Sequence, residues 1–337
     1  NRVLEGIQSG TYVPLRMSPL IIISTVLTHA FGGSAGREGA ALQLGGSLGG
    51  TIGKWLKLDE YDQKVMIMCG MSAAFSALFG TPLTATIFAM EVVSIGIMEY
   101  AALVPCAIAS LIAREMADLV GARAEQFPVP ASVALDIKSG ALIVLLALLC
   151  AAVSILFCEV LHRTERLFKS RMKNPWIRVV VGALLVIVLA KVLGTTDYLG
   201  AGMNIVERAI HGETEPAAFL LKIIFTAITL SCGFKGGEIV PTLCVGAALG
   251  CAFGEITGFA PSLCAACGMA ALFAGVTNCP ITSLVIALEL FGYEGMEYFS
   301  IIIAVAFALS GYYGLYASQK FVYSKTRTEF INRRSNG

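Results

Sequence analysis

Two acidic residues stand in sequence that is otherwise apolar enough for a membrane interior, and each follows glycines. Glu38 belongs to residues 36–40 (GREGA), and Glu238 belongs to residues 236–241 (GGEIVP). Intramembrane carboxylates are costly unless they are paired, protonated or in contact with water, so both acids are candidates for function. The glycines before Glu38 predict a broken segment and a new helix that starts at Glu38, whose free backbone N–H groups would form an anion site. A carboxylate there competes with an anion when it is ionised and leaves when it is protonated.

The composition places the chain in a lipid bilayer. Of its 337 residues, 56% are hydrophobic and 14% are charged, and the mean hydropathy is +0.77. Soluble proteins carry about 25% charged residues, so the sequence predicts an all-α polytopic membrane protein. The formal net charge of +1 argues against nucleic acid as a partner.

Cysteine and histidine patterns indicate no metal or cofactor. The ten cysteines lie mostly in apolar segments and are expected to be reduced packing residues. Cys264 and Cys267 have CxxC spacing, but no second pair and no histidine lies nearby. We expect a protein that is not an enzyme. The remote alternative is an intramembrane enzyme that uses Glu38 and Glu238 as an acid–base pair.

Apolar segments recur along the chain, and several are shorter than the ~20 residues that cross a bilayer upright. Glycine or proline interrupts most of them, which is tolerated where unwound backbone lines a polar cavity inside the protein. Residues 120–137 contain Arg123, Glu125, Pro128 and Pro130 and are expected to link two halves. The expected spans are 18–32, 38–53, 64–79, 82–97, 100–119, 141–161, 179–193, 217–232, 239–254, 262–273, 280–291 and 299–316.

The charge distribution predicts the orientation of the chain. Residues 162–173 are rich in lysine and arginine and are predicted to be a cytoplasmic loop under the positive-inside rule. The basic C-terminal end, with Lys320 and Lys325, should share that side. The acidic, glycine-containing residues 194–216 would then be an exterior loop.

An internal repeat is the strongest organisational signal. The matched positions are 69–75 with 267–273, Pro82 with Pro280, Glu91 with Glu289, Gly45 with Gly246, and Gly49 with Gly250. This alignment places Glu38 opposite Ile239. Two copies of a broken-helix unit with a site between them describe many secondary transporters, whether the copies are parallel or inverted. We expect a first transmembrane repeat in residues 1–125, with its N-terminal part missing. A second repeat with a cytoplasmic C-terminal end is expected in residues 126–337.

These motifs resemble those of the CLC family of anion channels and proton-coupled anion antiporters. Residues 36–39 (GREG) are similar to the family's GREGP or GKEGP signature, and residues 236–241 to its GGxFxP signature. The resemblance extends from about Glu5 to Tyr316, and a third signature, GSGIP, would fall before Asn1. It implies two inverted repeats of short, broken, tilted helices, and a homodimer with one pathway per subunit.

The resemblance also implies roles for single residues. Glu38 would be the external gating glutamate, and Tyr316 would lie at the inner mouth of the anion site, with Tyr312, Tyr313 and Tyr323 as rivals. Glu238 would assist proton or anion passage on the inner side, unless it pairs with Lys235 only to hold the loop. The anion-binding residues would be Gly36, Arg37, Gly39, Ala40, Gly237, Ile239, Val240 and Tyr316.

Four departures from the family pattern narrow the function. Ala40 replaces the final proline of GREGP, and Ile239 replaces the phenylalanine of GGxFxP. Glu238 stands where chloride-type members carry an apolar residue, and Val92 stands where chloride antiporters keep an internal proton-transfer glutamate. Loss of that glutamate is shared by channels and by fluoride–proton antiporters, whereas an extra acid beside the second anion-binding helix resembles the fluoride branch.

We therefore expect a secondary antiporter that exports fluoride in exchange for protons through a swap of the gating glutamate. Its expected location is the cell membrane, here the inner membrane of a bacterium. The alternative is a chloride/proton antiporter or a passive anion channel of the same fold, because backbone donors alone do not select fluoride over chloride.

Overall fold

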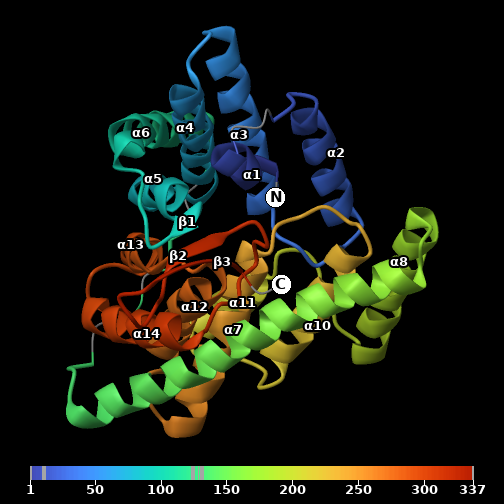
Figure 1. Cartoon of the computed structure of the whole chain (residues 1–337). Helices are drawn as coiled ribbons and strands as arrows, with labels where there is room; N and C mark the ends of the chain where they lie inside the picture. Colours follow the sequence, from blue (N-terminus) through green and yellow to red (C-terminus); the bar gives the residue numbers. More distant parts are fainter. Residues whose placement is uncertain (1, 10–12, 123–125, 128, 130–132, 336–337) are drawn as a thin grey trace.

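The computed structural model describes residues 2–9, 13–122, 126–127, 129 and 133–335, and the chain is mostly helical (Figure 1). The first half contains α1 (Arg2–Ser9), α2 (Met17–Ala30), α3 (Glu38–Trp55), α4 (Glu60–Phe79), α5 (Pro82–Glu91), the 3-10 helix η1 (Tyr100–Ala102) and α6 (Leu103–Leu119). The second half contains α7 (Ile137–Arg171), α8 (Pro175–Leu193), α9 (Met203–Ile210), α10 (Ala218–Ser231), α11 (Ile239–Thr257), α12 (Pro261–Thr277), α13 (Pro280–Phe291) and α14 (Met296–Leu309).

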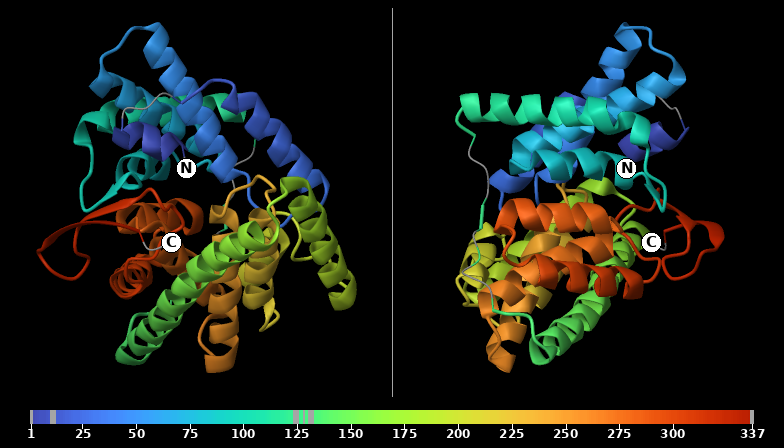
Figure 2. Two further views of the ribbon diagram at one scale, coloured as in Figure 1. Left: turned by 45° about the vertical axis from the view of Figure 1, so that its right-hand side comes forward. Right: turned by 90° about the vertical axis from the view of Figure 1, so that its left-hand side faces the viewer.

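The two halves are stacked, with α1–α6 in the upper part of the molecule and α7–α14 in the lower part (Figures 1 and 2). Helices α3 and α11 begin side by side, because Gly36 and Gly237 form an antiparallel bridge, and they run away from each other. This arrangement confirms two inverted repeats. Of the predicted linker, Arg123, Glu125, Pro128 and Pro130 lie outside the described residues, and the division at residues 125 and 126 stays a prediction.

A reciprocal pair of helix caps joins the repeats at α5 and α13. Glu289 of α13 accepts hydrogen bonds from the backbone N–H and the hydroxyl of Thr84, at 2.8 and 2.6 Å, at the start of α5. Glu91 of α5 accepts hydrogen bonds from the backbone N–H and the hydroxyl of Thr282, at 2.8 and 2.5 Å, at the start of α13. Each acid satisfies N–H groups that a helix start leaves free. The two helices are therefore antiparallel, and the repeat-related acids serve as caps.

Glycines let the helical hairpins of each repeat pack backbone against backbone. A Cβ at Gly45 of α3 would lie 2.0 Å from the carbonyl oxygen of Gly70 in α4. A Cβ at Gly246 of α11 would lie 2.4 Å from the carbonyl oxygen of Gly268 in α12. Both distances are too short for any side chain, so the repeated glycines are needed for the same close contact in each copy.

The helices confirm a polytopic membrane protein. Four described helical segments are long and apolar enough to cross a membrane: Tyr100–Leu119, α7, α8 and α11. Helix α8 exposes Val180 and Val192, at 58% and 77%, which suits contact with lipid. Helix α11 is buried along most of its length, which suits a central helix of the bundle.

Helix α7 corrects one prediction. It is 35 residues long and ends at Arg171, so most of the basic segment predicted as a loop at residues 162–173 is helical. Ion pairs at i, i+4 spacing, Glu159 with Arg163 and Glu165 with Lys169, stabilise this end of the helix.

A small sheet corrects two predicted boundaries. Strand β1 (Ser94–Ile95) pairs in parallel with β2 (Lys320–Tyr323), which pairs in antiparallel with β3 (Phe330–Arg334). The span predicted at 82–97 therefore ends with α5, because the chain turns into β1. The span predicted at 299–316 ends at Leu309, which leaves Tyr316 in a loop.

Candidate functional site

Two helix N-termini meet where the repeats touch. The N–H of Gly36 donates to the carbonyl of Gly237 at 2.8 Å, and the N–H of Gly237 donates to the carbonyl of Gly36 at 2.7 Å. Helix α3 begins at Glu38, as predicted, and α11 begins at Ile239. A Cβ at Gly237 would lie 2.5 Å from Oε1 of Glu38 and 2.6 Å from the backbone nitrogen of Gly39, so glycine is required there. Free N–H groups of both helix starts therefore converge.

The carboxyl group of Glu38 occupies the space between the two helix starts. Its side chain is 0% exposed, and its Oε1 accepts a hydrogen bond from the backbone N–H of Val240 at 2.8 Å. Its Oε2 is buried without a hydrogen-bond partner in the described part of the chain, which is rare for a buried polar atom. We call this space, lined by the starts of α3 and α11, the cradle.

The remaining predicted donors lie around the cradle. Gly39 is in the first turn of α3 against Gly237, and Ala40 follows it, half-buried. Arg37 is exposed and immediately precedes Glu38.

Glu238 borders a polar cavity beside the second helix start. The cavity measures about 240 Å³, and its lining includes Glu238, Lys235, Ser231, and His162 and Glu165 of α7. Glu238 is half-buried and Lys235 is exposed. No ion pair joins Glu238 to Lys235 within the described residues. The cavity therefore brings Glu238 together with further titratable groups.

His162 and Glu165 are additions that the sequence analysis missed. Both fall in the basic segment predicted as a loop, and a loop gives no reason for two of its side chains to share a face. On a helix, residues at i, i+3 spacing lie on the same face. The amphipathic continuation of α7 is the signal that could have placed them together.

Tyr316 lies in the loop after α14 and is buried at 7% exposure. The residue before it, Leu315, lines the cavity that Glu238 borders. Among the rival tyrosines, Tyr312 forms a hydrogen bond with Ser324 at 3.0 Å, and Tyr323 is 46% exposed. Tyr316 is thus buried and adjacent in sequence to a residue of the Glu238 cavity, and its role at the anion site stays a prediction.

Val92 is buried at the end of α5, at 1% exposure. Its carbonyl oxygen accepts a hydrogen bond from Nε2 of Gln319 at 3.0 Å. The adjacent Glu91 does not supply a free carboxylate near Val92, because its side chain caps the start of α13.

Metal chemistry finds no support in the described residues. They contain no group of three or more histidine, cysteine, aspartate or glutamate side chains placed to hold a metal ion. All ten cysteines are free and buried, in line with packing residues.

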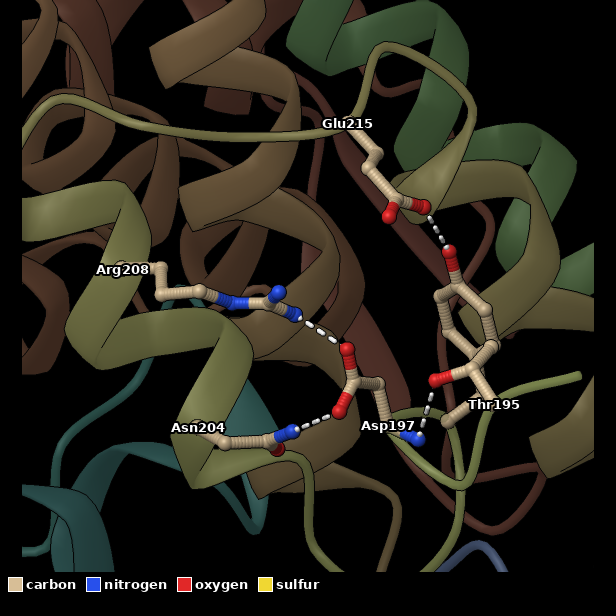
Figure 3. A network of polar contacts seen from close by, with 6 residues as sticks. Thr195, Asp197, Asn204, Arg208 and Glu215 are labelled. Atoms are coloured by element: carbon tan, nitrogen blue, oxygen red, sulfur yellow. Dashed lines mark hydrogen bonds and ion pairs between the residues drawn. The ribbon is translucent and has the colours of Figure 1, made fainter.

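A polar network orders the predicted exterior loop, which also contains α9 (Figure 3). The carboxylate of Asp197 accepts hydrogen bonds from Asn204 at 2.8 Å and Arg208 at 2.6 Å. The hydroxyl of Tyr198 donates to Glu215 at 2.8 Å. Burial and the neighbouring Glu215 raise the pKa of Tyr198. This loop reaches the cradle, because the N–H of Ala35 donates to the carbonyl of Gly200 at 3.1 Å.

The fold and the site define a polytopic membrane protein of two inverted repeats whose broken helices meet around a buried carboxylate. A family model described as voltage gated chloride channel matches residues 1–311, so the chain belongs to this family, the CLC family.

Relatives and solved structures agree with this family. A chloride/fluoride channel protein of Pseudomonas syringae pv. tomato (strain ATCC BAA-871 / DC3000) is 34% identical over 93% of this chain and 71% of its own length. The crystal structure of a CLC-type fluoride/proton antiporter superposes with a TM-score of 0.91, at 34% identity, over 95% of this chain and 81% of the other. A slow cyanobacterial Cl⁻/H⁺ antiporter shares the fold, with a TM-score of 0.75 at 20% identity over 88% of this chain and 72% of the other.

Proposed function

We propose that this protein is a secondary antiporter that exports fluoride in exchange for protons. The observation that carries this function is the carboxyl of Glu38 in the cradle, bonded to the N–H of Val240 at 2.8 Å. Backbone donors at helix starts hold a negative charge better than a neutral group. A protonated Glu38 therefore binds the cradle more weakly than an ionised one, and an anion replaces it.

The inner side supplies protons through Glu238. This acid borders a cavity lined also by His162 and Glu165, groups that can exchange protons with water. Because Val92 is apolar and buried, the internal acid cannot come from that position. Glu238 with its cavity is the proposed substitute.

Fluoride is favoured as the transported anion by the comparisons with known proteins, and the donors of the site are compatible with it. The relative from Pseudomonas syringae and the superposed antiporter both carry fluoride in their names. Fluoride is small and strongly hydrated, so a site that takes it needs dense donors in place of water. The converging amides and the hydroxyl of Tyr316 offer such donors.

The assembly and location belong to the same proposal. The protein would act as a homodimer with one pathway per subunit, in the inner membrane of a bacterium. The inward proton gradient would then drive fluoride out of the cell.

Reconstitution in liposomes tests the proposal. An imposed fluoride gradient should drive protons uphill, chloride should substitute poorly, and Glu38→Gln should abolish the coupling. Glu60→Gln, at an exposed glutamate paired with Lys64, is the matched control and should behave as the unmutated protein. Anion flux without proton movement in the unmutated protein would indicate a channel, and equal coupling with chloride would indicate a chloride antiporter.

A further inference from the structure

Helix α10 carries a fully buried lysine. Lys222 is 0% exposed, although lysine is almost never fully buried unless it is paired. Its Nζ donates hydrogen bonds to the carbonyl oxygens of Tyr198 at 3.2 Å and Gly200 at 2.8 Å. No carboxylate of the described residues forms an ion pair with it. Carbonyl dipoles thus hold the ammonium, and no direct ion pair within the described residues neutralises it.

The hydrogen bonds of Lys222 lead directly to the cradle. The carbonyl of Gly200 accepts both from Nζ of Lys222 and from the N–H of Ala35 at 3.1 Å. Ala35 is fully buried and precedes Gly36, which is bonded to the start of α11. The carbonyl of Gly200 therefore links the ammonium to Ala35, in the segment that leads into the cradle.

Packing fixes the ammonium near the cradle. Gly202 has a φ of +88°, and a Cβ there would lie 2.9 Å from Cε of Lys222 and 2.9 Å from the sulfur of Cys244 in α11. The side chain therefore fills the space between the exterior loop and α11. Glu38 lies against the same segment, because a Cβ at Gly36, the residue after Ala35, would be 2.1 Å from its Oε2.

A buried charge without an opposite charge is strongly unfavourable in an apolar environment. The cradle holds a negative charge in both states of the proposed exchange, first on Glu38 and then on the anion. We propose that Lys222 is the fixed counter-charge of the cradle: its ammonium stabilises whichever negative group occupies it. The inference deepens the proposed function and makes Lys222 a positioning residue with an electrostatic role.

Three substitutions separate this role from a mere tether of the exterior loop. Lys222→Gln keeps N–H donors for the carbonyls but removes the charge, Lys222→Met removes both, and Lys222→Arg keeps both. As a counter-charge, Lys222 should be replaceable only by arginine. The KM for the transported halide should rise about tenfold in the glutamine and methionine variants alike, with a smaller change in maximal flux.

The readout is the KM for whichever halide the unmutated protein carries, measured in liposomes. A failure of fluoride–proton exchange would overturn the proposed function, but the KM values of the Lys222 variants could still be compared with that of the unmutated protein. Lys191→Gln, at an exposed lysine in the last turn of α8, is the matched control and should keep the unmutated KM. An unchanged KM in Lys222→Gln would overturn the counter-charge. Should that variant not fold, Lys222→Arg decides: an unchanged KM supports the proposal, and a KM raised as in Lys222→Met overturns it.

Discussion

Oε1 of Glu38 accepts a hydrogen bond from the backbone N–H of Val240 at 2.8 Å, although the two residues lie 202 positions apart. This bond joins the first helix of the site, α3, to its repeat counterpart, α11. The carboxylate of Glu38, in the first repeat, thus accepts a hydrogen bond from a backbone N–H of the second repeat. Motion of one side chain therefore breaks or restores a contact between the repeats.

Gly36→Ala should disable the site without unfolding the protein. A Cβ at Gly36 would lie 2.1 Å from Oε2 of Glu38, so the carboxyl must leave the cradle. We expect loss of proton coupling with residual anion flux, measured in liposomes with fluoride and pH electrodes. The control is Gly140→Ala in α7, where a new Cβ would meet nothing closer than 3.9 Å. Normal coupling in Gly36→Ala would contradict the tight fit of the carboxyl.

Glu238→Gln should separate proton transfer from anion binding. The side chain borders the cavity with His162 and Glu165, whereas the cradle amides belong to the backbone. We expect proton flux to fall at least tenfold while the fluoride affinity, measured by calorimetry, changes little. Equal loss of both would indicate that Glu238 holds the start of α11 in place.

Glu289→Gln should lower stability and leave coupling intact. Its carboxylate accepts hydrogen bonds from the N–H and hydroxyl of Thr84 at 2.8 and 2.6 Å, and the amide replaces one accepting oxygen with a donor. Loss of a buried hydrogen-bond partner costs about 1–3 kcal/mol. The Tm should fall, as it should in the repeat-related Glu91→Gln, and exposed Glu294→Gln should leave it unchanged. Lost coupling at an unchanged Tm would place Glu289 in the transport pathway.

Tyr198 should make stability depend on alkaline pH. Its pKa is raised in the folded protein from the ordinary value of 10.0 by burial and by Glu215. Above that pH the unfolded chain releases a proton that the folded protein keeps, so stability is fully present below about pH 10 and falls as the pH rises further. The Tm measured between pH 8 and 11 should fall less steeply in Tyr198→Phe than in the unmutated protein. An equally steep fall of the Tm in both proteins would contradict a raised pKa of Tyr198 in the folded state.

Local patterns made much of the fold and site predictable. The glycines before Glu38 predicted a helix break, and the matched Glu91 and Glu289 were part of the pattern that indicated a repeat. Orientation of the repeats could not be read from such matches, because either orientation conserves the same residues. The resemblance to a family, rather than the spacing, implied inversion.

The missed features depend on tertiary contacts. Basic residues in 162–171 suit either a loop or a solvated helix end, so their number alone could not show that His162 and Glu238 line the same cavity. Lys222 lies in a segment predicted as an apolar span, and a single lysine there was a signal. Its carbonyl partners come from a loop more than twenty residues earlier, a contact that local sequence does not encode.

The most direct test of the central claim is the proton uptake that accompanies fluoride binding. Calorimetry in buffers of different ionisation enthalpy measures it on the purified protein. If the Glu38 carboxylate occupies the cradle and leaves when protonated, the unmutated protein takes up a proton with each bound anion, and Glu38→Gln takes up none. Fluoride binding without proton uptake in the unmutated protein, or equal uptake in Glu38→Gln, would contradict the claim.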